Sequence, residues 1–216
     1  MSNRGRLFVL SAPSGSGKTS LANRLLELVD NLEFSVSYTT RSRRGAERDG
    51  FEYFFVDVAE FEAMIERQEF LEYEHVYGNY YGTNRRFVES RLEEGTDILL
   101  DIDIKGARMV VEQMPAAVRI FVLPPSYKVL RERLVGRGLD DPDIVECRLR
   151  AARQEIVSVK DYDYVIINND IERSVRDLRT VVEGPASEAE RFAGSRCKEI
   201  DRICRTFIPD TEVGKD

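Results

Sequence analysis

The sequence predicts an α/β protein whose core is a doubly wound parallel sheet, and three observations support this. Short apolar runs alternate with segments that carry apolar residues at helical spacing, which is the pattern of strands followed by helices. The apolar runs are continuous, as in strands buried on both faces of a parallel sheet. A glycine-rich segment joins the first apolar run to the first helical pattern. Strands and helices that alternate in this way favour right-handed crossovers.

The first predicted strand covers Leu7 to Leu10, and the predicted helix after it covers Thr19 to Val29. Leu21, Leu25 and Leu28 recur on one face of that helix. Three further strands, each followed by a helical segment, are predicted at Asp97–Ile102, Val118–Leu123 and Tyr164–Ile167.

Two segments interrupt this alternation. Residues 34–83 are dense in aromatic residues, Thr, Ser and Arg, and they predict an inserted lobe of strands around one short helix near Phe61 to Arg67. Residues 131–155 are rich in arginine, with Gly136, Gly138 and Pro142 breaking the helical pattern, and they predict a helical lid. We therefore expect a single domain over residues 1–216, with its core at 5–33, 84–130 and 156–186, and a C-terminal helix and tail at 187–216.

Composition excludes several classes of function. The chain has 216 residues and a net charge of -7, which argues against binding to nucleic acid or to an anionic membrane. No apolar run approaches the roughly 18 residues of a membrane span, and the N-terminal residues lack a secretory pattern. We expect a cytoplasmic protein. Its oligomeric state is left open by the sequence.

Cysteine and histidine chemistry is also disfavoured. The three cysteines have no metal-type spacing, which excludes a disulfide framework and a zinc site. His75 is the only histidine and lies in a glutamate-rich stretch, so we interpret it as a surface or packed residue.

The strongest motif is SAPSGSGKTS at residues 11–20, which fits a phosphate-binding P-loop with alanine in place of the usual first glycine. Its glycines let backbone N–H groups turn toward phosphate oxygens at a helix N-terminus. Lys18 is expected to reach the β and γ phosphates of ATP, and the Thr19 hydroxyl to bind Mg²⁺. The residues predicted to bind ATP here are Ala12, Pro13, Ser14, Gly15, Ser16, Gly17, Lys18, Thr19 and Ser20.

Acidic and basic groups complete the candidate site. Asp101 and Asp103 follow an apolar strand, and ligands of open α/β sheets bind at that end of the strands. Asp101 is therefore a candidate to hold Mg²⁺ together with Thr19. Within residues 34–83, the guanidinium groups of arginines and the hydroxyls of tyrosines are suited to bind a phosphate monoester. Neutral or anionic side chains in the same segment are suited to bind a nucleotide base.

These motifs, in their order and spacing, resemble guanylate kinase over residues 5–182. The resemblance rests on FSVSYTTRSRRGAERDGFEYFFV, FLEYEHVYGNYYGT, DILLDIDIKGA, RERLVGRG and VIINND. It implies transfer of the γ-phosphoryl group of ATP to GMP by a P-loop core with a GMP-binding lobe at 34–83 and a lid at 131–155. ATP and GMP are then the substrates, dGMP is an expected further acceptor, and Mg²⁺ is the expected cofactor.

The resemblance also implies roles for individual residues. Guanine recognition is implied for Ser37, Glu72, Thr83 and Asp103. Binding of the GMP phosphate is implied for Arg41, Arg44, Tyr53 and Tyr81. Closure over the ATP phosphates is implied for Arg133, Arg137 and Arg148, and a place near the adenine for Asn168. Lys18, Arg41, Arg137 and Arg148 are the expected catalytic residues.

The chain departs from the family pattern at two positions, because Arg43 replaces a proline and Lys105 replaces a common glutamine. Two alternatives remain. A non-catalytic module that binds phosphorylated peptides is disfavoured by Lys18, Thr19 and the lid arginines. A kinase with another acceptor is disfavoured by the pairing of Ser37 with Glu72.

Overall fold

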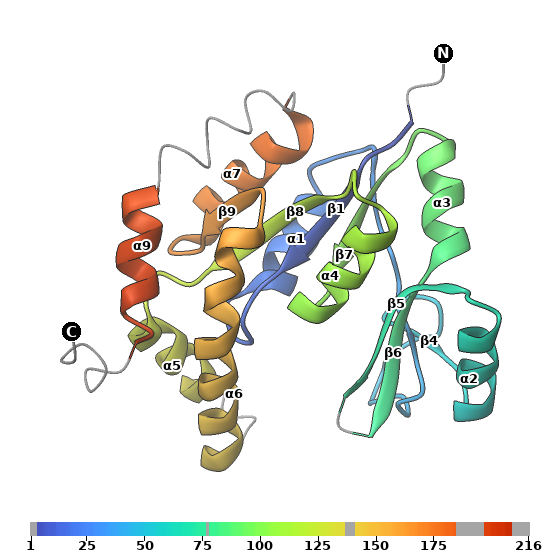
Figure 1. Cartoon of the computed structure of the whole chain (residues 1–216), viewed down its shortest axis with the longest axis horizontal. Helices are drawn as coiled ribbons and strands as arrows, with labels where there is room; N and C mark the ends of the chain where they lie inside the picture. Colours follow the sequence, from blue (N-terminus) through green and yellow to red (C-terminus); the bar gives the residue numbers. More distant parts are fainter. Residues whose placement is uncertain (1–3, 77, 137–140, 185–196, 209–216) are drawn as a thin grey trace. The chain divides into compact units, whose positions relative to one another are not determined.

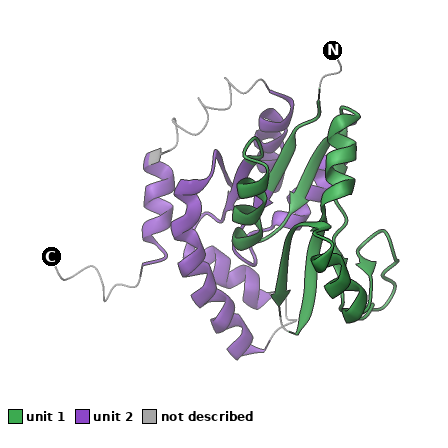
Figure 2. Cartoon of the chain, turned by 45° about the vertical axis from the view of Figure 1, so that its right-hand side comes forward, with its two compact units in different colours: residues 1–9, 31–118 green, residues 10–30, 119–216 purple. Residues whose placement is uncertain are grey.

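The computed structural model describes residues 4–76, 78–136, 141–184 and 197–208 (Figure 1). Two compact units make up the chain (Figure 2). One comprises residues 1–9 and 31–118, and the other comprises residues 10–30 and 119–216. The division falls within strands β1 (Leu7–Ser11) and β8 (Val118–Leu123).

A five-stranded sheet has the order β2-β7-β1-β8-β9. Its remaining strands are β2 (Leu32–Phe34), β7 (Asp97–Asp101) and β9 (Tyr164–Ile167). β2 runs parallel to β7, and β8 runs parallel to β9 with Ile120 opposite Tyr164. The side chains of the central strand β1 are buried throughout, as expected for a strand covered on both faces, and those of the edge strand β9 are buried as well.

Helices follow these strands. In the second unit they are α1 (Lys18–Leu26), α5 (Tyr127–Gly136), α6 (Pro142–Glu155), the 3₁₀ helix η1 (Ile156–Asp161), α7 (Ile171–Glu183) and α9 (Cys197–Arg205). In the first unit α3 (Arg85–Glu93) and α4 (Ile104–Gln113) flank β7 in the chain. Asn84 and Asp103 cap these two helices, since their side chains accept hydrogen bonds from Phe87 N (2.9 Å) and Gly106 N (2.8 Å).

The first unit carries a second sheet with the order β4-β3-β6-β5 and the helix α2 (Val58–Glu66). Its strands are β3 (Tyr38–Thr39), β4 (Phe54–Phe55), β5 (Phe70–Val76) and β6 (Asn79–Asn84). β3 is parallel to β4, whereas β6 is antiparallel to both β3 and β5, so the sheet is mixed. Phe61 of α2 stacks between Phe70 (4.4 Å) and Tyr80 (5.1 Å), which attaches the helix to the sheet.

The predicted fold class is confirmed: a parallel α/β sheet is accompanied by a smaller mixed sheet with its own helix. The strands at 118–123 and 164–167 have the predicted bounds, and the strand predicted at 97–102 ends one residue earlier. The helix predicted to reach Val29 ends at Leu26. The short helix predicted from Phe61 begins at Val58, because Asp57 caps it through Glu60 N at 2.7 Å.

The remaining differences concern two elements that were not predicted and the C-terminal segment. The elements are β2 and α3. A helix is present in the predicted C-terminal segment, at Cys197–Arg205, while residues 187–196 and 209–216 of that segment lie outside the described residues. The limits assigned to core, lobe and lid stay a prediction. Within the described ranges, no helix has both the length and the apolar character needed to span a membrane.

Candidate functional site

The glycine-rich loop between β1 and α1 has the geometry of an anion cradle. Gly17 caps α1 with φ 88, a left-handed conformation, and as the cap residue it makes no side-chain hydrogen bond to the helix. The Ser16 hydroxyl is buried, and no hydrogen-bond partner for it lies among the described residues. A helix N-terminus beside a buried hydroxyl that has no partner in the described part of the chain fits the phosphate chain of a nucleotide.

Asn168, which follows β9, is hydrogen-bonded to the backbone of this loop. Its side-chain amide donates to the Ser16 carbonyl at 2.7 Å, and it is buried. An ideal Cβ on Gly17 would lie 2.5 Å from the same amide nitrogen, so only glycine fits at that position. The structure therefore gives Asn168 a contact with the P-loop backbone in addition to the place near adenine implied by the resemblance.

Arg133 of α5 contacts the same loop. Its guanidinium donates to the Asn168 carbonyl at 2.9 Å and to the Ser16 carbonyl at 3.5 Å. Burial lowers the pKa of Arg133 from its ordinary value. The predicted lid thus begins on a helix that is bonded to the P-loop.

Glu72 on β5 carries a buried carboxyl group. Its side chain is 6% exposed and accepts a hydrogen bond from the Thr83 hydroxyl of β6 at 2.5 Å. The pKa of Glu72 is raised to about 7, mainly by burial and in smaller part by the charges of Asp103 and Glu74, while the bond from Thr83 opposes the rise. Within the described residues, no arginine or lysine forms an ion pair with it. A buried carboxylate of this kind is suited to accept hydrogen bonds from a ligand.

The N-terminus of α4 approaches this carboxylate. An ideal Cβ on Gly106 would lie 2.9 Å from Glu72 Oε2, so the glycine leaves room for the glutamate. Asp103, the cap of α4, hydrogen-bonds Glu74, and this contact together with burial raises the pKa of Glu74. Lys105 opposes that rise through an ion pair with Glu74 at 2.9 Å. Predicted guanine-site residues from three elements therefore lie together in the first unit.

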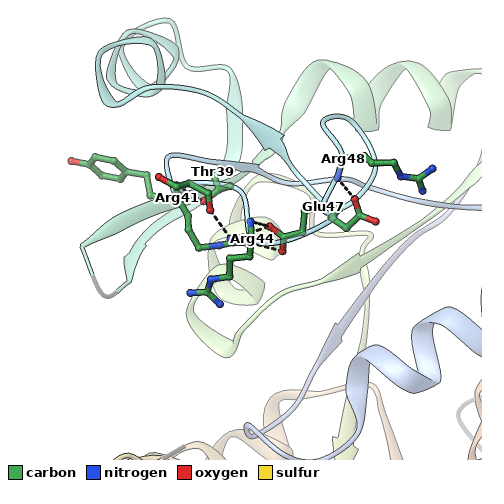
Figure 3. Close-up of polar contacts among 8 residues, drawn as sticks. Thr39, Arg41, Arg44, Glu47 and Arg48 are labelled. Carbon is green, nitrogen blue, oxygen red and sulfur yellow. Dashed lines mark hydrogen bonds and ion pairs between the residues drawn. The ribbon is translucent and has the colours of Figure 1, made fainter. Parts of the chain in front are cut away.

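Arg41 and Arg44 lie on the loop that follows β3 (Figure 3). Arg41 donates through both terminal nitrogens to the Glu47 carboxylate, at 3.0 and 2.8 Å, and its guanidinium lies over the Tyr53 ring at 5.3 Å. The Tyr53 and Tyr81 rings are 5.9 Å apart. The structure thus brings the four residues predicted to bind the phosphate to one region, and it adds an acidic residue, Glu47, that no sequence motif indicated.

The remaining predicted residues are placed as follows. Ser37 precedes β3, and its carbonyl accepts from Phe54 N at 2.9 Å. Lys18 and Thr19 begin α1, and Arg148 is half-buried on α6. Asp101 ends β7. Arg137 lies outside the described residues.

The residues predicted to bind Mg²⁺ offer suitable chemistry. Thr19 contributes a hydroxyl and Asp101 a carboxylate, and Mg²⁺ prefers oxygen ligands of this kind. The unpartnered Ser16 hydroxyl and the left-handed glycines of the neighbouring loop fit the triphosphate that would carry the ion. Asp101 belongs to the first compact unit and Thr19 to the second.

Comparison with known proteins identifies the family of the chain. The family model described as guanylate kinase matches residues 4–184. A guanylate kinase of Dechloromonas aromatica (strain RCB) is 49% identical over 178 residues, which cover 82% of this chain and 88% of that protein. A guanylate kinase of Koribacter versatilis (strain Ellin345) is 49% identical over 201 residues, covering 92% and 85%.

A solved structure is similar over nearly the whole chain. The crystal structure of guanylate kinase from Anaplasma phagocytophilum has a TM-score of 0.70 and 35% sequence identity, and the match covers 96% of this chain and 98% of that one. With a family model that spans most of the sequence and relatives that are nearly half identical over most of their length, the chain belongs to the guanylate kinase family.

Proposed function

We propose that the chain acts as its family name states: it transfers the γ-phosphoryl group of ATP to GMP, giving ADP and GDP, as a step of purine nucleotide metabolism. The observation that carries the assignment of the acceptor is the buried Glu72 carboxylate, which has a hydroxyl donor in Thr83 and the negative charges of Asp103 and Glu74 nearby. The expected cytoplasmic location and the use of dGMP stay predictions.

Guanine is the base that satisfies this carboxylate. It presents N1–H and the N2 amino group as adjacent donors, which a carboxylate can accept together. Adenine has an acceptor at N1 and no amino group at position 2, so it would leave the buried Glu72 charge unpaired. A site with buried polar groups of this kind can reject the wrong partner by roughly 10⁴-fold.

The phosphate of GMP is assigned to the loop after β3 and to the neighbouring tyrosines. Arg41 and Arg44 contribute guanidinium groups, and Tyr53 and Tyr81 contribute hydroxyls. Burial is the main cause that raises the pKa of Tyr53, so its hydroxyl stays protonated and able to donate. Ser37 and Asp103 are assigned to the guanine side, with Thr83.

ATP is assigned to the P-loop, with Lys18 at its phosphates and Arg133, Arg137 and Arg148 as lid residues. Mg²⁺, held by the phosphates with Thr19 and Asp101, would supply charge compensation for the transferring group. The protein residues hold two polyanions in line and exclude water, which would otherwise accept the phosphoryl group.

No general base is needed for this reaction. The attacking phosphate oxygen of GMP is already largely ionised near neutral pH, because its second pKa is about 6. The reaction therefore depends on positioning and charge, which suits a chain whose sequence has a single histidine, His75 on β5.

The test is release of ADP from Mg-ATP with GMP, dGMP, AMP, CMP and UMP offered separately. We expect turnover with GMP at least roughly 100-fold above that with AMP. The matched variant Glu72→Gln offers one acceptor and turns an amino group toward guanine, so we expect it to lose GMP turnover by roughly 100-fold while ATP binding is unchanged. Equal turnover with every acceptor, or full GMP turnover in the variant, would contradict the assignment.

A further inference from the structure

We propose that Glu47 is a positioning residue for the phosphate of GMP, which it serves by fixing the Arg41 guanidinium and the backbone of Arg44 in one arrangement. This inference rests on the proposed function, because it concerns the loop assigned to that phosphate. Glu47 is not among the residues for which the family resemblance implies GMP binding.

The Glu47 carboxylate accepts three hydrogen bonds (Figure 3). Arg41 donates from its two terminal nitrogens, at 3.0 Å to one oxygen and 2.8 Å to the other, and the backbone N–H of Arg44 donates at 2.8 Å. A two-pronged arginine–carboxylate pair fixes orientation as well as distance. One side chain therefore ties together both arginines that are assigned to the phosphate.

The pair is partly shielded from water. The Arg41 side chain is 10% exposed and that of Glu47 is 22% exposed. The Arg41 guanidinium lies over the rings of Tyr53 at 5.3 Å and Phe55 at 5.7 Å. Because Arg41 packs on Tyr53, the position of the Tyr53 ring also depends on the carboxylate that fixes Arg41.

Glu47 also closes the turn that carries Arg44. Its backbone N–H donates to the Arg44 carbonyl at 3.1 Å while its side chain accepts from the Arg44 N–H. The Arg44 guanidinium points away from Glu47 (Figure 3) and is exposed, and within the described residues no carboxylate forms an ion pair with it. Glu47 thus holds the backbone of Arg44 and leaves its cationic group for an incoming phosphate.

Glu47 would act differently if it merely occupied the place of the phosphate. A carboxylate that competes with the ligand would weaken GMP binding, and its removal would strengthen it. The bond to the Arg44 N–H and the closed turn argue for the positioning role, because Glu47 cannot leave Arg41 freely without opening that turn. A substitution of Glu47 should therefore weaken GMP binding if the residue positions the arginines, and strengthen GMP binding if it competes with the phosphate.

The experiment compares Glu47→Gln with the matched control Glu52→Gln. Glu52 lies on the same loop and accepts from the Arg48 backbone N–H at 2.6 Å, so it has the same kind of backbone contact and no described bond to the arginines assigned to the phosphate. Affinities for GMP and for guanosine are measured by calorimetry, and KM and kcat are measured for GMP and ATP. Guanosine reports the base site without the phosphate.

We expect Glu47→Gln to lower GMP affinity and raise the KM for GMP by about tenfold, with guanosine affinity and the KM for ATP within about twofold of the original chain. Glu52→Gln should match the original chain in every measurement. Three results would overturn the inference: unchanged GMP affinity, increased GMP affinity, or an equal loss for GMP and guanosine.

Two controls keep the result interpretable. If Glu47→Gln fails to fold, Glu47→Asp keeps the charge and shortens the reach by one methylene, and a selective loss of GMP over guanosine is again expected; its absence overturns the inference. Failure of the proposed function is a separate outcome, because the unaltered chain would then neither bind GMP more tightly than guanosine nor release ADP with it.

Discussion

The Thr83 hydroxyl donates a 2.5 Å hydrogen bond to the Glu72 carboxylate, across the antiparallel pair of β5 and β6. Glu72 and Thr83 are register partners in that pair, and both side chains are buried. A buried carboxylate prefers its protonated form, and a hydrogen bond to the charged form opposes that preference. The strand register thus sets the protonation of the group assigned to guanine.

Removal of this bond should shift the pH dependence of GMP use. The pKa of Glu72 is raised to about 7, and the carboxylate form is the one that accepts both guanine donors, so kcat/KM for GMP should rise with pH through about 7. Thr83→Val removes the donor and should move that rise upward by about one pH unit. The measurement is kcat/KM for GMP against pH, and Thr83→Ser, which keeps the hydroxyl, should follow the original profile. An unshifted profile in Thr83→Val would contradict the role of this bond.

Glu72 should also make folding stability depend on pH. Its ordinary pKa of 4.5 is raised in the folded chain to about 7, so between these values the folded state holds a proton more tightly than the unfolded state. Stability from this group is therefore greatest below about pH 4.5 and declines as pH rises through about 7, by on the order of 3 kcal/mol.

The Glu72→Gln variant has no titrating group at this position, so it tests the predicted dependence of folding stability on pH. The free energy of unfolding in urea should favour the variant over the original chain more strongly at about pH 8 than at about pH 5. Glu66→Gln, on the exposed end of α2, should show no such difference between the two pH values. The same stability difference for Glu72→Gln at both values would rule out a raised pKa at this position.

Much of the fold could be predicted because the sheet of the core leaves a local signal. Continuous apolar runs gave the bounds of β8 and β9, since both strands are buried along most of their length. β2 has only three residues and pairs with β7, which is distant in the sequence, so no local pattern reveals it. The start of α2 depended on the cap at Asp57, which lies outside the apolar pattern.

The candidate site was predicted less completely, for a physical reason. The P-loop has a fixed spacing because one loop must supply all of its N–H groups, and it could be read from ten residues. Glu47 was missed because its role depends on a loop that folds back on Arg41, and an acidic residue among arginines is usually a solvated one. The contact of Asn168 with Ser16 joins residues 152 positions apart, which no local pattern indicates.

The departure at Lys105 should have a small effect on stability. Its ion pair with Glu74 at 2.9 Å has a lysine side chain that is 78% exposed, and exposed pairs contribute about 0 to 1 kcal/mol. Lys105→Gln should therefore change the free energy of unfolding by less than about 1 kcal/mol, and the difference should shrink further at high salt. Urea titrations at two salt concentrations check this. A larger loss that salt does not reduce would show that Lys105 does more than form this exposed pair.

Asn168 should affect ATP through the P-loop backbone and not only through the adenine ring. Its amide bonds the Ser16 carbonyl at 2.7 Å, and its carbonyl accepts from Arg133 at 2.9 Å. Asn168→Ala leaves the Ser16 carbonyl without the amide and frees the loop, so affinity for Mg-ATP should fall by about tenfold. The discriminating ligand is Mg-tripolyphosphate, which has no base. It should lose affinity by the same factor if Asn168 acts through the loop, and it should be unaffected if Asn168 acts only on adenine. Guanosine affinity, measured in parallel by calorimetry, should stay unchanged and shows that the first unit is intact.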